Sequence, residues 1–502
     1  MRLDEVTIAS LQSKMASGEA NATQVVTEYL RRVSEIDQAG PSLRSVVELS
    51  PDAISDAEQR DRQREQGHLQ GALHGIPLLI KDSIDTADRT QTMGGSLALA
   101  GNYAEQDAFA VGRLRDAGAV ILGKTNMSEW GYMRSTRACS GWSSRGGQTR
   151  NPYVLDRSPL GSSSGSAVAV AANLCMGAVG AEVDGSIVRP ASSNGIVGLK
   201  PTVGLLSRSG VIGVASPQDT VGPMARTVRD VAVLLSHMTG EDPKDPVTHH
   251  EIARREYDYA ARLEGAALEG VRLGVAREHF GFHEGTDAVI EEALGVLREL
   301  GAVIVDPVRA SRLPMFGPEE LTLFRYELKG KLNQYLADHP KIGVRNLDQL
   351  IEFNRANATS VMPFFQQELF EQVQRTGGLD ESEYLKAKSE CVRLSRTEGI
   401  DLAMREHTLD AIVAPTEGTP AWCIDPVVGD HLVGGCSSPA AVAGYPHITV
   451  PAGFVHGLPV GLSLFGLPYQ EENLLRYAYA FEQATHVRRP PTYLTSVNID
   501  GV

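Results

Sequence analysis

Residues 160–203 read LGSSSGSAVAVAANLCMGAVGAEVDGSIVRPASSNGIVGLKPTV. A serine-rich turn at 161–166 is followed by a helix of small residues, Ala167–Asn173, and then by a second turn at 184–186. Glycine and serine at this density are typical of flexible linkers, but here they alternate with valine, alanine, isoleucine and leucine. Inside a core, glycine occurs where backbone approaches backbone or a ligand. The stretch therefore predicts a buried site with two serine hydroxyls and several free backbone N–H groups.

Length, composition and charge limit the classes of protein to which this chain can belong. The chain has 502 residues, of which 42% are hydrophobic and 22% charged, so burial of a large core is feasible. The net charge of −15 and the pI near 5.4 argue against nucleic acid or an anionic membrane as a partner, because both are bound through clustered lysine and arginine.

Targeting and redox signals indicate an intracellular protein. The N-terminus, MRLDEVTIASLQSKM, lacks the apolar segment of a signal peptide, and no apolar run reaches the length of a membrane span. The five cysteines are scattered and contain no C-x-x-C pair, so neither a disulfide framework nor a zinc site is indicated. We expect a cytoplasmic protein with no metal and no membrane partner.

Helical and strand patterns alternate over most of the chain, which favours one α/β unit with a central sheet. We expect an N-terminal helical segment packed on the core (1–70), a core (71–240), a helix-rich cover (241–400) and the C-terminal part of the core sheet (401–490). Thr23 is the predicted N-cap of the first helical stripe.

Individual elements follow from periodicity and turn residues. Buried strands are predicted at 76–80, 119–122, 270–276, 302–305 and 409–415, helices at 108–118, 222–239 and 287–300, and a helix followed by two short strands at 438–466. Residues 124–152 form a long predicted loop, and loops of this length within a compact domain tend to be functional.

Lys81, Ser162 and Ser186 are the reactive candidates. A serine hydroxyl needs a base to become a nucleophile, and a lysine is such a base when burial disfavours its charged form. Lys81 ends a predicted strand, where open α/β sheets place their sites, although a lysine at a strand end more commonly reaches to water. The turn at 182–186 offers N–H donors for an oxyanion.

Other chemistries are less well supported. His74, His407 and His447 lie near predicted strand ends and leave a Ser-His-Asp arrangement open, with a structural role as the simpler interpretation. The context of Ser186 is D-G-S-I-V rather than G-x-S-x-G. No G-x-x-x-x-G-K-[ST] motif is present, which disfavours nucleotide binding by a P-loop.

Seven motifs carry a resemblance to a known family. They are HGIPLLIKDSID, ILGKTNMSEW, GQTRNP, GSSSGSAVAVAA, DGSI..PA, GLKPTVG, and GYPHITVP with GLPVGLSLFG. The chain resembles the amidase signature family, whose motifs occur in this order, over about 70–470. The GSSSGS loop and SGWSSRGGQTRNPY are most similar to the bacterial peptide amidases within that family.

The resemblance implies a mixed, twisted sheet flanked by helices and a Ser-Ser-Lys triad. Ser186 matches the nucleophile, Ser162 the bridging serine in a cis peptide, and Lys81 the base. No cofactor is implied. The groups implied to bind the oxyanion are the backbone N–H groups of Val183, Asp184, Gly185 and Ser186.

The implied function is hydrolysis of linear amides, with C-terminal peptide amides as the expected substrates and ammonia as a product. The alternatives are a broad aryl or aliphatic acyl amidase, a carbamate hydrolase, and the glutaminase subunit of a tRNA-dependent amidotransferase. For the amidase we expect a small-molecule or peptide amide as the only partner, in a monomer or homodimer.

The chain departs from the family in the turn around the nucleophile. The usual G-T-E-T-D-G-S is here GAEVDGS at 180–186, so Ala181 and Val183 replace two threonines. The arginine commonly two places after the nucleophile is Val188, with Arg189 one place later. We expect these changes to affect the support of the oxyanion loop, defined here as residues 183–186.

Overall fold

The computed structural model describes residues 3–255 and 257–498. An 11-stranded sheet runs through the molecule in the order β1-β3-β2-β6-β8-β7-β12-β13-β11-β9-β10. Its strands are β1 (Val46–Leu49), β2 (Pro77–Lys81), β3 (Val120–Thr125), β6 (Gly177–Glu182), β7 (Val197–Lys200), β8 (Thr220–Ala225), β9 (Arg272–Ala276), β10 (Val303–Val308), β11 (Ala411–Pro415), β12 (His447–Val455) and β13 (Leu458–Phe465). The strands β3-β2-β6 are parallel, and β6-β8-β7-β12-β13-β11 are antiparallel. This confirms the single α/β unit with a mixed central sheet.

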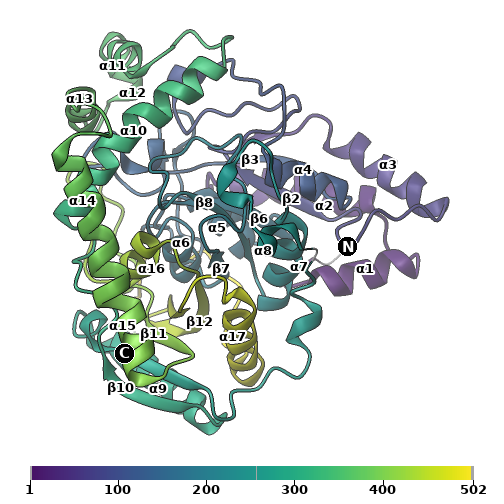
Figure 1. The fold of residues 1–502 in the computed structure, drawn as a ribbon. Helices are drawn as coiled ribbons and strands as arrows, with labels where there is room; N and C mark the ends of the chain where they lie inside the picture. The colour runs from purple at the N-terminus through teal and green to yellow at the C-terminus, as the bar shows by residue number, and fades with distance from the viewer. Residues whose placement is uncertain (1–2, 256, 499–502) are drawn as a thin grey trace.

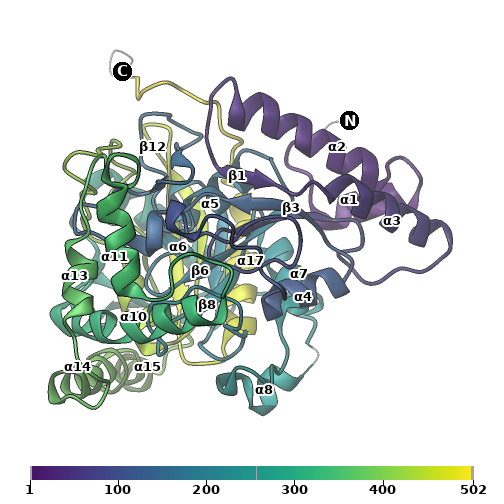
Figure 2. The same cartoon turned by 90° about the horizontal axis from the view of Figure 1, so that it is seen from above.

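Helices flank the sheet (Figure 1). They are α1 (Ile8–Ala16), α2 (Ala22–Arg32), α3 (Ala53–Glu65), α4 (Phe109–Asp116), α5 (Ser164–Ala171), α6 (Val188–Ser193), α7 (Val228–Met238), α8 (Glu251–Arg254), α9 (Glu284–Glu299), α10 (Pro318–Asp338), α11 (Leu347–Ala356), α12 (Ala358–Val361), α13 (Glu368–Gln374), α14 (Ser382–Val392), α15 (Asp401–His407), α16 (Ser437–Ala443) and α17 (Glu471–Thr485). Figure 2 shows α1–α3 at one end and α10, α11, α13 and α14 at the other. No helix of the described ranges is long and apolar enough to cross a membrane.

Strand β2 positions Lys81, one of the three reactive candidates. All five of its residues are buried, as expected for a run of leucine and isoleucine with a parallel neighbour on each side. Lys81 is its last residue. The lysine side chain therefore starts at the carboxyl end of the strand, where the chain leaves the sheet.

The N-terminal segment differs from the prediction in two places. Helix α2 begins at Ala22, and its N-cap is Asn21, whose side chain accepts a hydrogen bond from the Gln24 backbone N–H. The predicted cap at Thr23 is wrong, because the Thr23 hydroxyl donates to Asp61 instead. Residues 1–70 also contain strand β1, which pairs antiparallel with β3 at the sheet edge; its four residues are too few to show a clear period.

The predicted helix at 222–239 is wrong in its first part. Residues Thr220–Ala225 form strand β8, and α7 begins only at Val228, capped by the Thr227 hydroxyl. Gly222 and Pro223 both disfavour a helix. Strand β6 was not predicted, because its glycine and alanine residues have low strand propensity. Pairing with β2 and β8 places it in the sheet.

The remaining predicted elements are confirmed within a few residues. Strands β2, β3, β9, β10 and β11 lie where buried runs were predicted, and α16, β12 and β13 follow one another over 437–465. Helix α5 begins at Ser164, three residues before the predicted start. The long segment 126–152 is mostly irregular. It contains one short 3-10 helix and a small hairpin of two strands, β4 (Trp142–Ser143) and β5 (Gly147–Gln148).

Candidate active site

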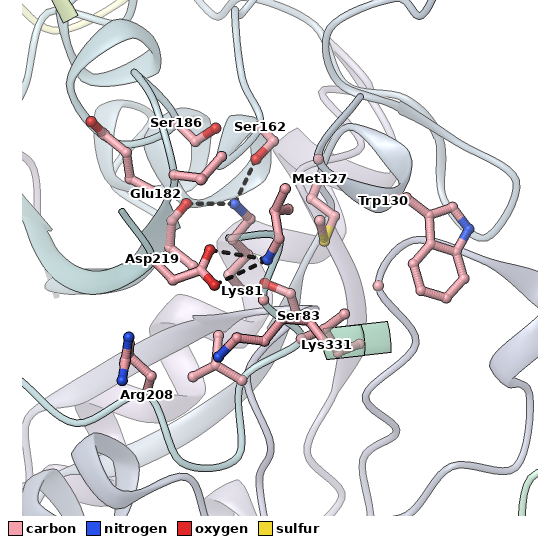
Figure 3. Close-up of a pocket in the computed structure, with 18 of the residues that line it drawn as sticks. Lys81, Ser83, Met127, Trp130, Ser162, Glu182, Ser186, Arg208, Asp219 and Lys331 are labelled. Carbon is pink, nitrogen blue, oxygen red and sulfur yellow. Dashed lines mark hydrogen bonds between the residues drawn. The ribbon is translucent and has the colours of Figure 1, made fainter. Parts of the chain in front are cut away.

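Lys81 and Ser162 meet at the carboxyl end of β2 (Figure 3). The Lys81 Nζ donates hydrogen bonds to the Ser162 Oγ and to the backbone carbonyl of Ala181, each at 2.8 Å. Only 2% of Lys81 is exposed. Burial lowers the pKa of Lys81 to about 7, against the opposing effect of the Glu182 carboxylate. A substantial share of this lysine is therefore neutral near pH 7, as a base requires.

The loop that carries Ser162 is packed tightly between neighbouring segments. The Gly161–Ser162 peptide bond is cis. A Cβ on Gly161 would lie 2.3 Å from the Ser128 Oγ, so only glycine fits this position. The Ser162 carbonyl accepts a hydrogen bond from the Ser128 N–H at 3.1 Å. These contacts hold the backbone of the loop in place, and the Ser162 hydroxyl is positioned by its hydrogen bond with Lys81.

Ser186 lies in the turn between β6 and α6. The turn is closed by Glu182, whose Oε2 accepts hydrogen bonds from the backbone N–H groups of Ile187 at 2.6 Å and Val188 at 3.1 Å. Gly185 has a φ of +75°, which favours glycine. The Ser186 carbonyl accepts a hydrogen bond from the Ser163 N–H at 3.1 Å. The two serine-bearing turns of the opening stretch are thus bonded to each other.

One pocket brings the three reactive candidates together. Lys81, Ser162 and Ser186 all line it (Figure 3). Of the oxyanion loop, Val183 and Ser186 line the pocket, and Asp184 is directed toward Ser438 on α16. Among the other lining side chains, Met127, Trp130, Ile212, Val214 and Leu328 are apolar, Glu182, Arg208, Asp219 and Lys331 are charged, and Ser83 and Thr220 carry hydroxyls.

Helix α10 contributes to the pocket, which the sequence did not reveal. Leu328 and Lys331 lie nearly one helical turn apart on α10 and both line the pocket. The helix-rich region 308–400 contains no sequence motif that marks a functional residue. The i, i+3 spacing of the two residues was the available signal, but many surface positions share it.

The three histidines named from the sequence are not at this site. The His74 Nε2 lies 2.8 Å from the Arg60 carbonyl, and the His447 Nε2 lies 2.6 Å from the Ser463 hydroxyl. Burial lowers the pKa of His447 to about 3. No histidine of the described residues lines the pocket. Nor does the described part of the chain hold a cluster of histidine, cysteine, aspartate or glutamate suited to a metal ion.

Arg189 supports the turn from outside the pocket. Its guanidinium forms a two-pronged ion pair with Glu417, with Nη2 to Oε2 at 2.8 Å, and 5% of each side chain is exposed. A Cβ on Gly185 would lie 2.3 Å from the Arg189 Cδ, so the arginine stem packs directly on the turn. Arg189 is thereby fixed by Glu417 beside the oxyanion loop.

Glu417→Ala should lower the free energy of unfolding by about 3–5 kcal/mol, because it leaves the Arg189 guanidinium buried without a counterion. Urea denaturation measures the change. The double variant Arg189→Met with Glu417→Leu is the matched control, and it should recover most of the loss. Equal stability of Glu417→Ala and the parent would contradict a strong role for this pair.

The fold places a buried lysine beside two serines in one pocket, and comparison with known proteins identifies the class of protein. A family model described as Amidase matches residues 24–475. The chain belongs to the amidase signature family and is a hydrolase that acts on amides.

Three similar proteins are informative. The X-ray structure of native peptide amidase from Stenotrophomonas maltophilia is 48% identical, with a TM-score of 0.93, and covers 98% of this chain and 99% of that chain. A probable amidase of Arabidopsis thaliana is 38% identical, over 98% of this chain and 92% of its own. One subunit of the glutamyl-tRNA(Gln) amidotransferase of Chloroflexus aurantiacus is 34% identical, over 97% of this chain and 99% of its own.

Proposed function

We propose that this protein hydrolyses linear amides, with C-terminal amides of peptides as its main substrates and ammonia as the released product. The observation that carries the proposal is the buried 2.8 Å hydrogen bond between Lys81 and Ser162 in a pocket that Ser186 also lines. The 48% identity to a peptide amidase over nearly the full length of both chains supports the substrate class.

The proposed mechanism has two halves. Neutral Lys81 accepts the proton of Ser162 while Ser162 accepts that of Ser186, and the Ser186 Oγ attacks the amide carbon. The nitrogen of the tetrahedral intermediate takes a proton back through Ser162 and leaves as ammonia. Water then attacks the acyl-enzyme by the same route, which releases the carboxylic acid and restores Ser186.

The oxyanion loop is suited to hold the negative charge of the intermediate. Within the described part of the chain, the backbone N–H groups of Asp184, Gly185 and Ser186 donate to no protein acceptor. Preorganised donors of this kind contribute strongly to acyl transfer because they need no reorganisation during the reaction. The replacement of two threonines by Ala181 and Val183 leaves these N–H groups in place.

The pocket walls favour an apolar residue next to the amide. Met127, Trp130 and Leu328 contribute apolar side chains to the pocket that the reactive serines line. Burial of apolar substrate surface against them is favourable by roughly 25 cal/mol per Å². We therefore infer that amides of leucine or phenylalanine are better substrates than amides of glycine.

The purified protein alone should release ammonia from a dipeptide amide such as glycyl-phenylalanine amide, and not from free glutamine. An enzyme-coupled ammonia assay measures both, with Ser186→Ala as the blank. An anilide and a carbamate in the same assay test the broader amidase and carbamate alternatives. Glutaminase activity that appears only with a partner protein and tRNA would replace the proposal by the amidotransferase alternative, which the 34% identity to the Chloroflexus amidotransferase chain supports.

A further inference from the structure

Two buried carboxyl groups lie against each other behind the oxyanion loop. Asp184 belongs to the loop itself, and Glu320 comes from the first turn of α10. Glu320 is fully buried, and 4% of Asp184 is exposed. The two side chains are in hydrogen-bonding contact. The helix-rich cover thereby reaches the residue two places before Ser186.

A chain of hydrogen bonds runs through this contact. The Gln218 Nε2 donates to the Val183 carbonyl at 3.2 Å and to the Glu320 Oε1 at 2.7 Å. The Asp184 Oδ2 accepts a hydrogen bond from the Ser438 hydroxyl. Glu320 is therefore linked to Val183 through Gln218 and to Asp184 directly.

The contact requires a proton. The Asp184 Oδ1 and the Glu320 Oε2 are buried and have no N–H or hydroxyl donor with normal geometry among the described residues. Two buried carboxylates in contact cannot both be ionised. Burial raises the pKa of Glu320 well above its usual value, and the neighbouring Asp184 raises it further. Burial raises the pKa of Asp184 as well, but the hydroxyls of Ser437 and Ser438 and the Arg189 guanidinium oppose that rise. For Glu320, in contrast, the neighbouring Asp184 adds to the effect of burial, so Asp184 is the charged member of the pair.

We propose that Glu320, as a neutral carboxylic acid, donates a hydrogen bond to Asp184 and acts as a positioning residue that holds the oxyanion loop in its reactive geometry. This inference rests on the proposed function, since it assigns Ser186 and the loop their catalytic roles. Glu320 touches no reacting atom. Its contribution is to keep the N–H donors where the oxyanion forms, and a displacement of such donors by about 1 Å lowers the rate by about 100-fold.

Glu320→Gln and Glu320→Leu separate this role from simple packing. The glutamine amide can donate to Asp184 and accept from Gln218, so kcat should stay within about threefold of the parent. The leucine cannot donate, so kcat should fall by about 100-fold while KM changes less than about threefold. Glu319→Leu, the same change at the neighbouring residue, is the matched control and should stay within about threefold. All rates are measured with whichever amide the parent protein hydrolyses.

Infrared difference spectroscopy of the resting protein at pH 7 tests the proton directly. The spectrum of the parent minus Glu320→Gln should contain the carbonyl stretch of a protonated carboxylic acid. This measurement needs no substrate, so it also decides the case if Glu320→Leu fails to fold. Absence of the acid band, or kcat of folded Glu320→Leu within threefold of the parent, would overturn the proposal. Activity retained by Ser186→Ala would instead overturn the proposed function, and the two failures are thus distinct.

Discussion

Ser186→Ala should lower kcat by about 10⁴-fold or more, because removal of the nucleophile leaves only substrate binding and the oxyanion donors. Steady-state ammonia release with the dipeptide amide measures the loss. Ser186 is buried in the turn before α6, and removal of one hydroxyl there creates no large cavity. The circular dichroism spectrum and Tm of the variant should therefore match those of the parent.

Ser192→Ala is the matched control for this experiment. Ser192 is buried as well, but it lies on α6 and outside the pocket lining. Its substitution should leave kcat within about threefold of the parent. Activity of Ser186→Ala near that of Ser192→Ala would show that the nucleophile is another residue. A trapped acyl-enzyme on Ser186, detected by mass spectrometry after rapid quenching, provides a second and independent check.

Lys81→Met should lower kcat/KM by about 10³-fold at neutral pH, because the base that receives the serine proton is lost. In the parent, kcat/KM should rise as the pH increases through about 7, where the buried Lys81 loses its proton. The residual activity of the variant should show no such rise. A pH–rate profile from pH 5 to 9 records both results.

Lys331→Met is the control for the pH profile. Lys331 lines the same pocket from α10, so its loss can change KM, but the rise near pH 7 should remain. If Lys331→Met removes the rise and Lys81→Met retains it, the base is misassigned.

Lys81 should lower the stability of the folded protein near neutral pH, although the proposed mechanism needs it for activity. Its pKa falls from 10.5 for the free side chain to about 7 in the folded protein. Between these values the unfolded chain binds a proton that the folded chain does not, so this residue reduces stability as the pH falls from about 10.5 to 7. Lys81→Met removes that penalty, and its Tm at pH 7 should equal or exceed that of the parent.

Much of the fold could be predicted from local pattern. The buried runs at β2 and β11 and the helix–strand–strand sequence from α16 to β13 show clear periodicity and turn residues. Strands β6 and β8 could not be predicted this way, because glycine, alanine and proline carry little strand signal. They become strands through pairing with β2 and with each other. Pairing partners far apart in sequence supply the backbone hydrogen bonds that local preference does not.

The amino-acid sequence was sufficient to single out Lys81, Ser162 and Ser186 as reactive candidates, because a serine nucleophile needs a base and glycine-rich turns need close packing. Only the tertiary structure decided what surrounds them. The pKa of Lys81 depends on burial by segments far apart in the chain, and Leu328, Lys331 and Glu320 reach the site from a helix more than 130 residues beyond Ser186. The desolvation of a side chain and its contacts with distant residues arise only in the folded chain, so no local sequence motif predicts them.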